Sequence, residues 1–557
     1  MPVAGTAAKV SDIVETLARS RWASVAAVVV VALACFLPGF GTMAPLDGDE
    51  PGYAVAAREM VATGDYVGVR LQTESAELRP RGAYWIEAFA VAVTGGDPPI
   101  WVYRLPSLVA AVAAAVATWW LALAFGSAPA ALLSGLFVAA SGVVGLEARL
   151  ATPDTILLAA ATLSAAALAR VWLDRGSTAD GLNAFLFWTG LGVGILAKGV
   201  IAPAIAAAAI LILSFHRGEV RWLKRLRSGP GFVWLFLIVS PWLIALALTL
   251  LQGGGDEPSP EFLDRLGVPF ALVAPPGVYV LLLPLLAGPC VTFIFLAVRW
   301  IASDLARPVV FFSFAWGGPL WLAAELVHNK LPQNILPAIP AVALIAGAAI
   351  AAGACRIGGR VSWFYSLGPA LWPPLTAAAA PFAFFFLQGR VPIFATGCFV
   401  AAAVLGVISW LWIRRGEGVA AGLLSVVTVV FIYLGFFGAF VPGIGALRVG
   451  ERIAATAAEV VPCTRPIYAA TGYPEESLVL ALGPQTRLVD PWSAADFLNS
   501  AGCRIAAVDA SQISAFHQRV EDIGIAVVDR GHVQGFDLRR MRAVDVHLFT
   551  TAGSNGS

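Results

Sequence analysis

The residues best suited to chemistry lie in a polar stretch, residues 46–85, that follows the first long apolar run of the chain. Asp49 and Glu50 stand together near its start. A carboxylate at a membrane surface can accept a proton from a hydroxyl group or hold a cation. The same two acids could instead be solvated loop residues or a helix N-cap, because the sequence that follows them is typical of a helix. Asp49 is the best single candidate for a catalytic group.

Other ionisable groups stand at the edges of later apolar runs. Asp154 begins one run within the motif ARLATPD, where it could serve chemistry or compensate a helix N-terminus. Lys198 separates two runs and Lys330 precedes another, so each could bind an anion or extend to the membrane interface. Arg79 suits either a phosphate or a lipid headgroup, since a guanidinium donates two parallel hydrogen bonds. Such a set suits a reaction on a phosphate-linked lipid, with an acid activating the acceptor and cations stabilising the leaving phosphate.

The composition indicates which elements must position these groups. Of 557 residues, 59% are hydrophobic and only 13% charged, which is typical of a polytopic membrane protein. The net charge of +1 argues against nucleic acid as the main partner. The first apolar run lacks a clear cleavage site and is expected to be a retained span. We predict thirteen spans, at about residues 22–40, 103–125, 129–146, 154–173, 182–197, 200–215, 231–251, 277–298, 308–327, 333–353, 366–386, 391–413 and 419–441.

The distribution of basic residues predicts the orientation of these spans. With a cytoplasmic N-terminus, the connections rich in Lys and Arg, such as residues 217–227, all fall inside, as the positive-inside rule requires. The C-terminus then lies outside the cytoplasm. Asp49, Asp154, Lys198 and Lys330 all fall on that outer side, where they could line one cavity.

From about Gly445 the composition becomes that of a soluble domain. Short β-type runs alternate with helix-type runs, which predicts a small α/β domain with a partly parallel sheet. Cys463 and Cys503 each precede a predicted strand, and whether they form a disulfide is open. The other four cysteines fall in or beside predicted spans, where cysteine is most often a small apolar side chain.

These segments, taken in order, resemble bacterial membrane glycosyltransferases of the lipid A aminoarabinose transferase type, within the protein O-mannosyltransferase superfamily. The motifs that support the resemblance are Asp49–Asp65 (DEPGYAVAAREMVATGD), Arg79–Trp85 (RPRGAYW), Ala148–Asp154 (ARLATPD), Ala197–Gly199 (AKG) and Lys330–Pro337 (KLPQNILP). The fold implied is a polytopic α-helical membrane protein of the GT-C type, with about 13 transmembrane helices and a small C-terminal periplasmic α/β domain. Residues 1–444 would form the transmembrane glycosyltransferase domain, with an external catalytic loop at 41–102, and residues 445–557 the periplasmic domain.

The resemblance also implies a function. A sugar would move from a polyprenyl (undecaprenyl) phosphate donor to a lipid A-like or other envelope acceptor, on the periplasmic face of the bacterial inner membrane. Asp49, Glu50 and Asp154 would be catalytic. The donor phosphate would be bound by Arg58, Arg79, Arg149, Lys198 and Lys330. The substrate pocket would contain Tyr53, Tyr84, Trp85, His328, Gln333 and Asn334. A divalent metal ion (Mg, Mn or Zn) held by Asp49 and Asp154 is left open.

Two departures from the family leave the identity of the sugar open. Glu77-Leu78-Arg79-Pro80 replaces an aromatic-acid-Lys-Pro run, and Gln333-Asn334 replaces Thr-Tyr after Lys-Leu-Pro. The alternative function is a transporter or flippase of lipid-linked sugars. A transporter would be expected to place ionisable groups near the bilayer midplane and to contain related repeats. The sequence shows no internal repeat, and most span interiors are Ala, Leu and Val, which favours the enzyme.

Overall fold

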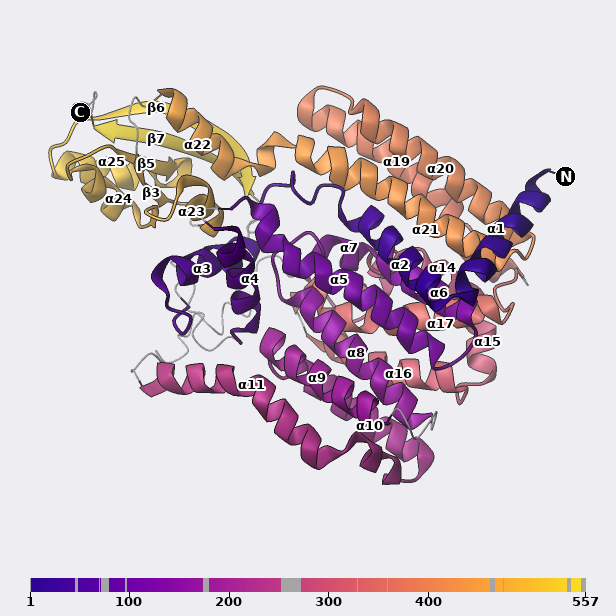
Figure 1. Ribbon diagram of the computed structural model, residues 1–557. Helices are drawn as coiled ribbons and strands as arrows, with labels where there is room; N and C mark the ends of the chain where they lie inside the picture. Colours follow the sequence, from indigo (N-terminus) through magenta and orange to yellow (C-terminus); the bar gives the residue numbers. More distant parts are fainter. Residues whose placement is uncertain are drawn as a thin grey trace.

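The described part of the chain forms a helical bundle with a small sheet domain at one end (Figure 1). The computed structural model describes residues 2–45, 49–69, 71, 80–95, 98–173, 180–251, 272–327, 329–357, 359–460, 466–473, 475–537 and 542–551. The C-terminal domain lies at the end of the bundle where α3 (Asp49–Thr63) and α4 (Gly82–Thr94) also lie. The N-terminus lies at the opposite end.

Among the described residues, nine helices are long and apolar enough to cross a bilayer. They are α5 (Ile100–Leu123), α8 (Asp154–Trp172), α9 (Asp180–Lys198), α11 (Ser228–Leu251), α16 (Pro308–Leu326), η3 with α17 (Pro332–Ala338 and Ile339–Ala351), α19 (Gly368–Gln388), α20 (Ile393–Arg414) and α21 (Gly418–Gly435) with the short turns after it. Each coincides with a predicted span. The polytopic helical fold is therefore confirmed.

The other four predicted spans correspond to shorter or broken helices. They are α2 (Arg21–Phe36), α6 with α7 (Ala128–Ala139 and Gly142–Glu147), α10 (Ile201–Arg217), and α13 with α14 (Val278–Leu286 and Cys290–Leu296). Helix α13 ends just before Gly288, whose φ of 72° is left-handed and cannot continue a helix. A count of thirteen spans thus stays a prediction. The remaining short elements are α1 (Pro2–Arg19), η2 (Arg221–Leu226), α15 (Val298–Ser303), α18 (Arg360–Ser366), β1 (Leu272–Val273) and β2 (Asn329–Lys330).

Helix α8 forms the centre of the bundle, because it packs between α5 and α9. Small residues allow these helices to approach closely. A Cβ atom added to Gly190 of α9 would lie 2.5 Å from the carbonyl oxygen of Ala160 in α8. Such small-residue contacts replace the hydrophobic effect as the source of helix association inside a membrane. The contact fixes α8 and α9 close together.

The C-terminal residues form a mixed α/β unit, as predicted. The sheet order is β4-β3-β5-β7-β6, with β3, β4 and β5 parallel and β7 antiparallel to both β5 and β6. The strands are β3 (Ile467–Thr471), β4 (Arg487–Leu488), β5 (Arg504–Asp509), β6 (Val527–Asp537) and β7 (Arg542–Thr551). The helices are α22 (Val449–Val460), α23 (Glu476–Leu482), α24 (Pro491–Leu498) and α25 (Ile513–Asp522).

The cysteines of the C-terminal domain and of the helical bundle differ in their bonding state. Cys503 is disulfide-bonded, whereas Cys463, the partner considered from the sequence, lies outside the described residues. Cys35, Cys290, Cys355 and Cys398 are free and buried in the bundle, as predicted.

A glycine substitution tests the packing of α7 against α13. A Cβ atom at Gly142 would lie 2.0 Å from the backbone oxygen of Leu285, which cannot rotate away. We expect Gly142→Ala to cost about 1–3 kcal/mol of stability, as overpacking does. Thermal unfolding of the purified protein in detergent would measure this loss. Gly126→Ala is the matched control, since no atom lies within 4 Å of its added Cβ and its melting temperature should not change. Equal melting temperatures for the two variants would contradict the packing.

Candidate active site

An acidic cluster with one lysine forms where the start of α8 meets the end of α9, with the start of α3 nearby. The Lys198 ammonium lies 2.7 Å from Oδ1 of Asp154, and the side chains are 27% and 5% exposed. Asp49, at the start of α3, is exposed and close enough to contribute to the electrostatic environment of both. The structure thus brings together three of the residues selected from the sequence.

Local sequence explains why these side chains meet. Asp154 is the first residue of α8, immediately after Pro153, and an acid is favoured at that position by the helix dipole. Lys198 is the last residue of α9, because Gly199 adopts a left-handed φ of 64° and ends the helix there. The two helices run antiparallel, so the start of one and the end of the other meet at the same face of the bundle.

Glu147 is a fourth member of the cluster that the predicted site did not include. It ends α7, beyond the apolar helix α6, and its Oε2 accepts a 2.9 Å hydrogen bond from the Thr152 hydroxyl. Burial, followed by the negative charge of Asp154, raises the pKa of Glu147 to about 8. Lys198 opposes this rise and Asp49 adds to it. The signal in the sequence was an acid in the apolar segment just before ARLATPD.

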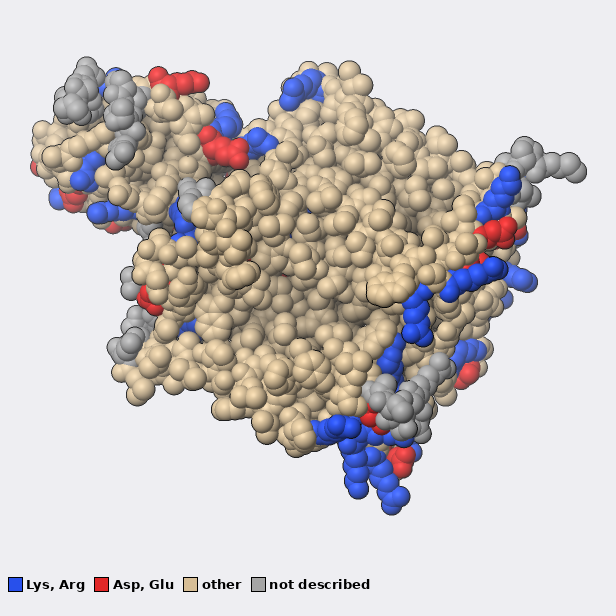
Figure 2. Space-filling model, in the orientation of Figure 1, with Lys and Arg blue, Asp and Glu red and all other residues tan. Residues whose placement is uncertain are grey.

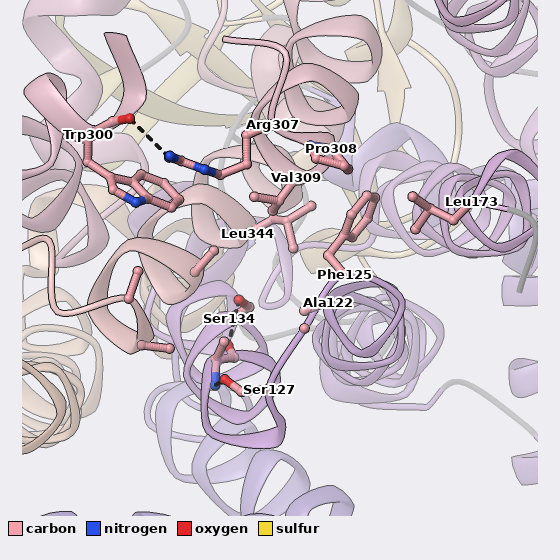
Figure 3. A pocket seen from close by; sticks show the side chains of 15 residues that line it. Ala122, Phe125, Ser127, Ser134, Leu173, Trp300, Arg307, Pro308, Val309 and Leu344 are labelled. Carbon is pink, nitrogen blue, oxygen red and sulfur yellow. Dashed lines mark hydrogen bonds between the residues drawn. The ribbon is translucent and has the colours of Figure 1, made fainter. Parts of the chain in front are cut away.

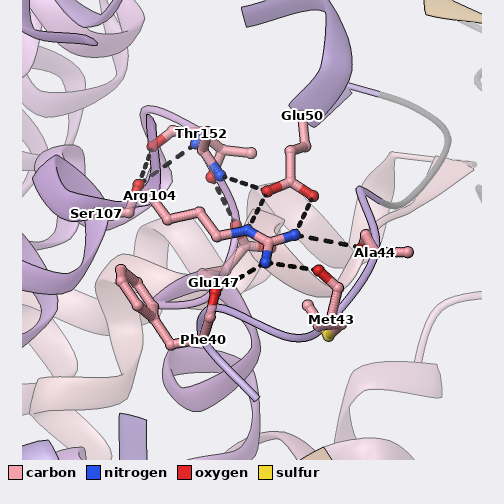
Figure 4. Close-up of polar contacts among 9 residues, drawn as sticks. Phe40, Met43, Ala44, Glu50, Arg104, Ser107, Glu147 and Thr152 are labelled. Atoms are coloured by element: carbon pink, nitrogen blue, oxygen red, sulfur yellow. Dashed lines mark hydrogen bonds and ion pairs between the residues drawn. The ribbon is translucent and has the colours of Figure 1, made fainter. Parts of the chain in front are cut away.

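Glu50 has a different environment from its neighbour Asp49. Its carboxylate is 2% exposed and forms a two-pronged ion pair with Arg104 of α5, with distances of 2.6 Å to Nε and 3.0 Å to Nη2 (Figure 4). Oε1 also accepts from the backbone N–H of Ala151. Both oxygens are therefore engaged, which favours a positioning role over the predicted catalytic one.

Arg104, which the predicted site also lacked, anchors the segment that precedes α3. Besides Glu50, its guanidinium donates to the backbone oxygens of Phe40, Met43 and Ala44 at 2.8–3.3 Å. The side chain is fully buried. An isolated arginine in the first turn of an apolar helix was the available signal, because a charge so placed needs a fixed partner.

Three of the predicted phosphate ligands bind backbone carbonyls in this structure. Arg149 is fully buried, donates to the oxygens of Pro38, Gly145 and Cys35, and lies 3.9 Å from the centre of the Phe437 ring. It therefore holds the end of α2 against α7 and α21.

Arg58 and Lys330 also have partners away from the cluster. Arg58 donates to the oxygen of Val479 in the C-terminal domain at 3.1 Å. The Lys330 ammonium, almost fully buried, donates to the oxygens of Ala324 and Glu325 at the end of α16 and lies 3.8 Å from the Glu325 carboxylate. In these positions neither side chain contacts the pair of Asp154 and Lys198.

The predicted pocket residues divide into two groups. Tyr53 and Tyr84 stack with ring centres 4.5 Å apart and join α3 to α4, while Trp85 donates to the oxygen of Tyr66 at 2.9 Å. Gln333 and Asn334 lie in η3, which packs against α7 and α8. Arg79 and His328, also predicted, lie outside the described residues.

The described side chains offer limited means of holding a metal ion. Within those parts of the chain, no three His, Cys, Asp or Glu residues are grouped so that they could bind one together. Asp49 and Asp154 remain the hypothetical ligands for such an ion.

Sequence comparisons match the chain to known glycosyltransferases. A family model described as dolichyl-phosphate-mannose-protein mannosyltransferase matches residues 79–244. The undecaprenyl phosphate-alpha-4-amino-4-deoxy-L-arabinose arabinosyl transferase of Edwardsiella ictaluri is 26% identical over 371 residues, which cover 62% of this chain and 63% of that protein. The transferase of the same name from Aeromonas salmonicida is 30% identical over 205 residues, 36% of each chain. The alignments thus span less than two thirds of these relatives.

Structural comparison covers nearly the whole chain. The crystal structure of ArnT from Cupriavidus metallidurans in the apo state matches with a TM-score of 0.73 and 19% identity, over 96% of this chain and 98% of that one. The ArnT structure bound to undecaprenyl phosphate matches with a TM-score of 0.72, also at 19% identity, over 96% and 99% of the chains.

These findings define first a class: a multi-pass protein of a bacterial inner membrane, with a GT-C fold and a small C-terminal sheet domain. Within that class, the chain shares the ArnT fold along its length and has sequence similarity with these transferases over its matched part. The resemblance predicted from the motifs is confirmed.

The ion pair of Glu50 and Arg104 yields a stability prediction. Glu50→Gln would leave a buried guanidinium without its counter-charge, so we expect a loss of about 3–5 kcal/mol. The melting temperature in detergent would measure it. Glu59→Gln, on the same helix but only partly buried and outside this ion pair, is the control and should unfold like the parent protein. If both variants unfold at the parent temperature, the pair does not anchor the loop.

The raised pKa of Glu147 yields a pH prediction. The folded-state pKa of about 8 exceeds the ordinary value of 4.5, so the unfolded chain loses this proton first as the pH rises. The stability contributed by the protonated form is complete below pH 4.5 and is lost as the pH rises to about 8. Glu147→Gln cannot titrate, so the decline in melting temperature across this window should be shallower than in the parent protein. Parallel pH profiles would contradict the assignment.

Proposed function

We propose that the protein transfers a sugar from a polyprenyl phosphate donor to a lipid A-like or other envelope acceptor. One observation carries the proposal: an exposed carboxylate, Asp49, stands beside the Asp154–Lys198 pair at the outer end of a bundle with the ArnT fold. Related transferases are named for an undecaprenyl phosphate-linked donor, and an ArnT structure contains undecaprenyl phosphate. The donor and the acceptor are therefore proposed as membrane-embedded partners.

The proposed reaction is a displacement at the anomeric carbon of the donor sugar. The acceptor oxygen forms a bond to this carbon, while the bond from the carbon to the phosphate oxygen breaks. Polyprenyl phosphate leaves with the electron pair. A hydroxyl acceptor gives its proton to Asp49, which acts as general base. A phosphate acceptor is already ionised near neutral pH, so Asp49 would then orient it.

Lys198 is the proposed ligand of the donor phosphate. The Lys198 side chain is 27% exposed and that of its partner Asp154 is 5% exposed, so the lysine is the more accessible member of the pair. A cation beside the leaving phosphate stabilises the charge that develops as the sugar bond breaks. Asp154 holds this cation in place and so has a positioning role. Arg79 is proposed as a second phosphate ligand on its motif alone.

The proposal also covers orientation and domain organisation. We place the N-terminus in the cytoplasm and the C-terminal domain in the periplasm, because basic residues concentrate at the end of the bundle away from that domain (Figure 2). Residues 1–444 would form the transferase domain and residues 445–557 the periplasmic domain. The external loop would span 41–102.

Replacement of the proposed base is the central test. We expect Asp49→Asn to lower transfer from a polyprenyl-phosphate sugar by at least about 100-fold, the usual contribution of a general base. The measurement is consumption of the lipid-linked donor and appearance of product, followed by mass spectrometry with purified protein. Because Asp49 is exposed, the variant should fold and melt like the parent protein.

Two controls make this test decisive. Glu59→Gln removes an acid from the same helix and should retain full activity. Normal turnover by Asp49→Asn would exclude Asp49 as the base. If the parent protein leaves the donor chemically intact but moves it between leaflets of a vesicle, the transporter alternative replaces the enzyme.

A further inference from the structure

A cavity of about 320 Å³ opens at the end of the bundle opposite Asp154 and Lys198 (Figure 3). It lies between the carboxyl ends of α5, α8 and α17 and the amino ends of α6 and α16. Residues at its mouth, including Ser127, Pro308 and Ala352, are exposed, whereas Ser134 and Leu344 on its floor are buried. The proposed transfer reaction uses none of these residues.

The mouth of the cavity is built to attract an anion. The guanidinium of Arg307 lies 4.1 Å from the centre of the Trp300 ring, and its Nη1 donates to the Trp300 oxygen at 3.0 Å. These two contacts hold the cation in place while leaving the side chain 28% exposed. Asp304 approaches it only at 3.9 Å and is itself 49% exposed, so this pair is weak and replaceable.

The amino ends of two helices face the cavity, but the carboxyl ends of α5, α8 and α17 face it too, so the helix dipoles largely offset each other. Helix α6 begins at Ala128 and α16 at Pro308, and both residues before these starts, Ser127 and Arg307, line the cavity. The amino end of a helix carries a partial positive charge and suits a phosphate. The net positive charge at the opening therefore comes from Arg307.

The walls below the mouth are apolar and small. Ala122, Val309, Leu344 and Ala348 line them, with Leu173 beside them (Figure 3). The volume is enough for a polar head group but not for two acyl chains, which would stay in the bilayer. The size lies at the lower limit of ordinary ligand pockets. This combination of an anion-binding mouth and an apolar interior matches the junction of a lipid head group with its chains.

We propose that this cavity binds the head group of an anionic glycerophospholipid from the leaflet at the basic end of the bundle. The lipid phosphate sits at Arg307, and the glycerol enters the apolar cavity below it. The surrounding surface is rich in Lys and Arg (Figure 2), which concentrates anionic lipids there. The site would make the protein sensitive to the lipid composition of that leaflet. This effect would be independent of the reaction at the other end of the bundle.

Native mass spectrometry of the purified protein with added phosphatidylglycerol tests the site. We expect one phosphatidylglycerol to bind more tightly than the rest, and phosphatidylcholine not to replace it. Arg307→Leu should weaken this binding at least about tenfold, as loss of a charge-assisted hydrogen bond does. Arg299→Leu is the matched control, since Arg299 is exposed on the same short helix as Trp300 but does not line the cavity, and its binding should stay within about twofold.

The remaining outcomes are also decisive. Equal lipid binding by Arg307→Leu and Arg299→Leu would reduce the site to a general basic surface and overturn the proposal. Displacement of phosphatidylglycerol by equimolar polyprenyl phosphate, in an Arg307-dependent manner, would assign the cavity to that lipid instead. If Arg307→Leu does not fold, Ala352→Phe decides, because it fills the exposed mouth without touching the arginine. Unchanged phosphatidylglycerol binding by that variant would overturn the proposal.

Discussion

The buried ion pair of Glu50 and Arg104 is the constraint on which the end of the bundle beside the C-terminal domain depends. Arg104 is fully buried and binds three backbone carbonyls as well as the carboxylate, so the chain around residues 40–44 and the start of α3 are fixed to α5. A buried charge that loses its partner is costly, and the loop therefore cannot leave this position without breaking the pair. The adjacent residue, Asp49, is held at the edge of the bundle with its carboxylate exposed.

The two neighbouring acids, Glu50 and Asp49, therefore have different roles. Glu50 points into the protein and uses both oxygens, whereas Asp49 stands free of that pair beside Asp154 and Lys198. An adjacent pair of acids in a sequence gives no indication of which one is buried. The direction is set at the first turn of α3, where successive residues point about 100° apart. The division follows from the partner on α5, which lies 54 residues away.

The sequence allowed prediction of the elements and of the common location of Asp154 and Lys198, because both follow from local patterns; the ion pair between them was not predicted. Apolar runs located the helices, alternation located the C-terminal sheet, and the one-sided placement of Asp154 and Lys198 followed from the positive-inside rule. The environments of Arg149, Arg58 and Lys330 could not be predicted in this way. A basic residue near a helix end looks the same whether it faces a phosphate or the carbonyls of another segment, such as Pro38 or Val479. Only the tertiary contacts distinguish these two cases.

Among the described residues, two arginines connect the C-terminal domain to this same end of the bundle. Arg58 of α3 donates to Val479 in α23, and Arg448, just before α22, donates to the oxygen of Thr42. Leu480 also packs against the apolar cluster that includes Tyr53 and Tyr84. The domain thus contacts both the helix that begins with Asp49 and the segment that Arg104 fixes. A domain placed in this way restricts the side from which an acceptor can approach Asp49, even though its own sequence contains no motif that identifies the acceptor. Selection of the acceptor would then depend on how the domain packs beside α3 rather than on a separate binding motif.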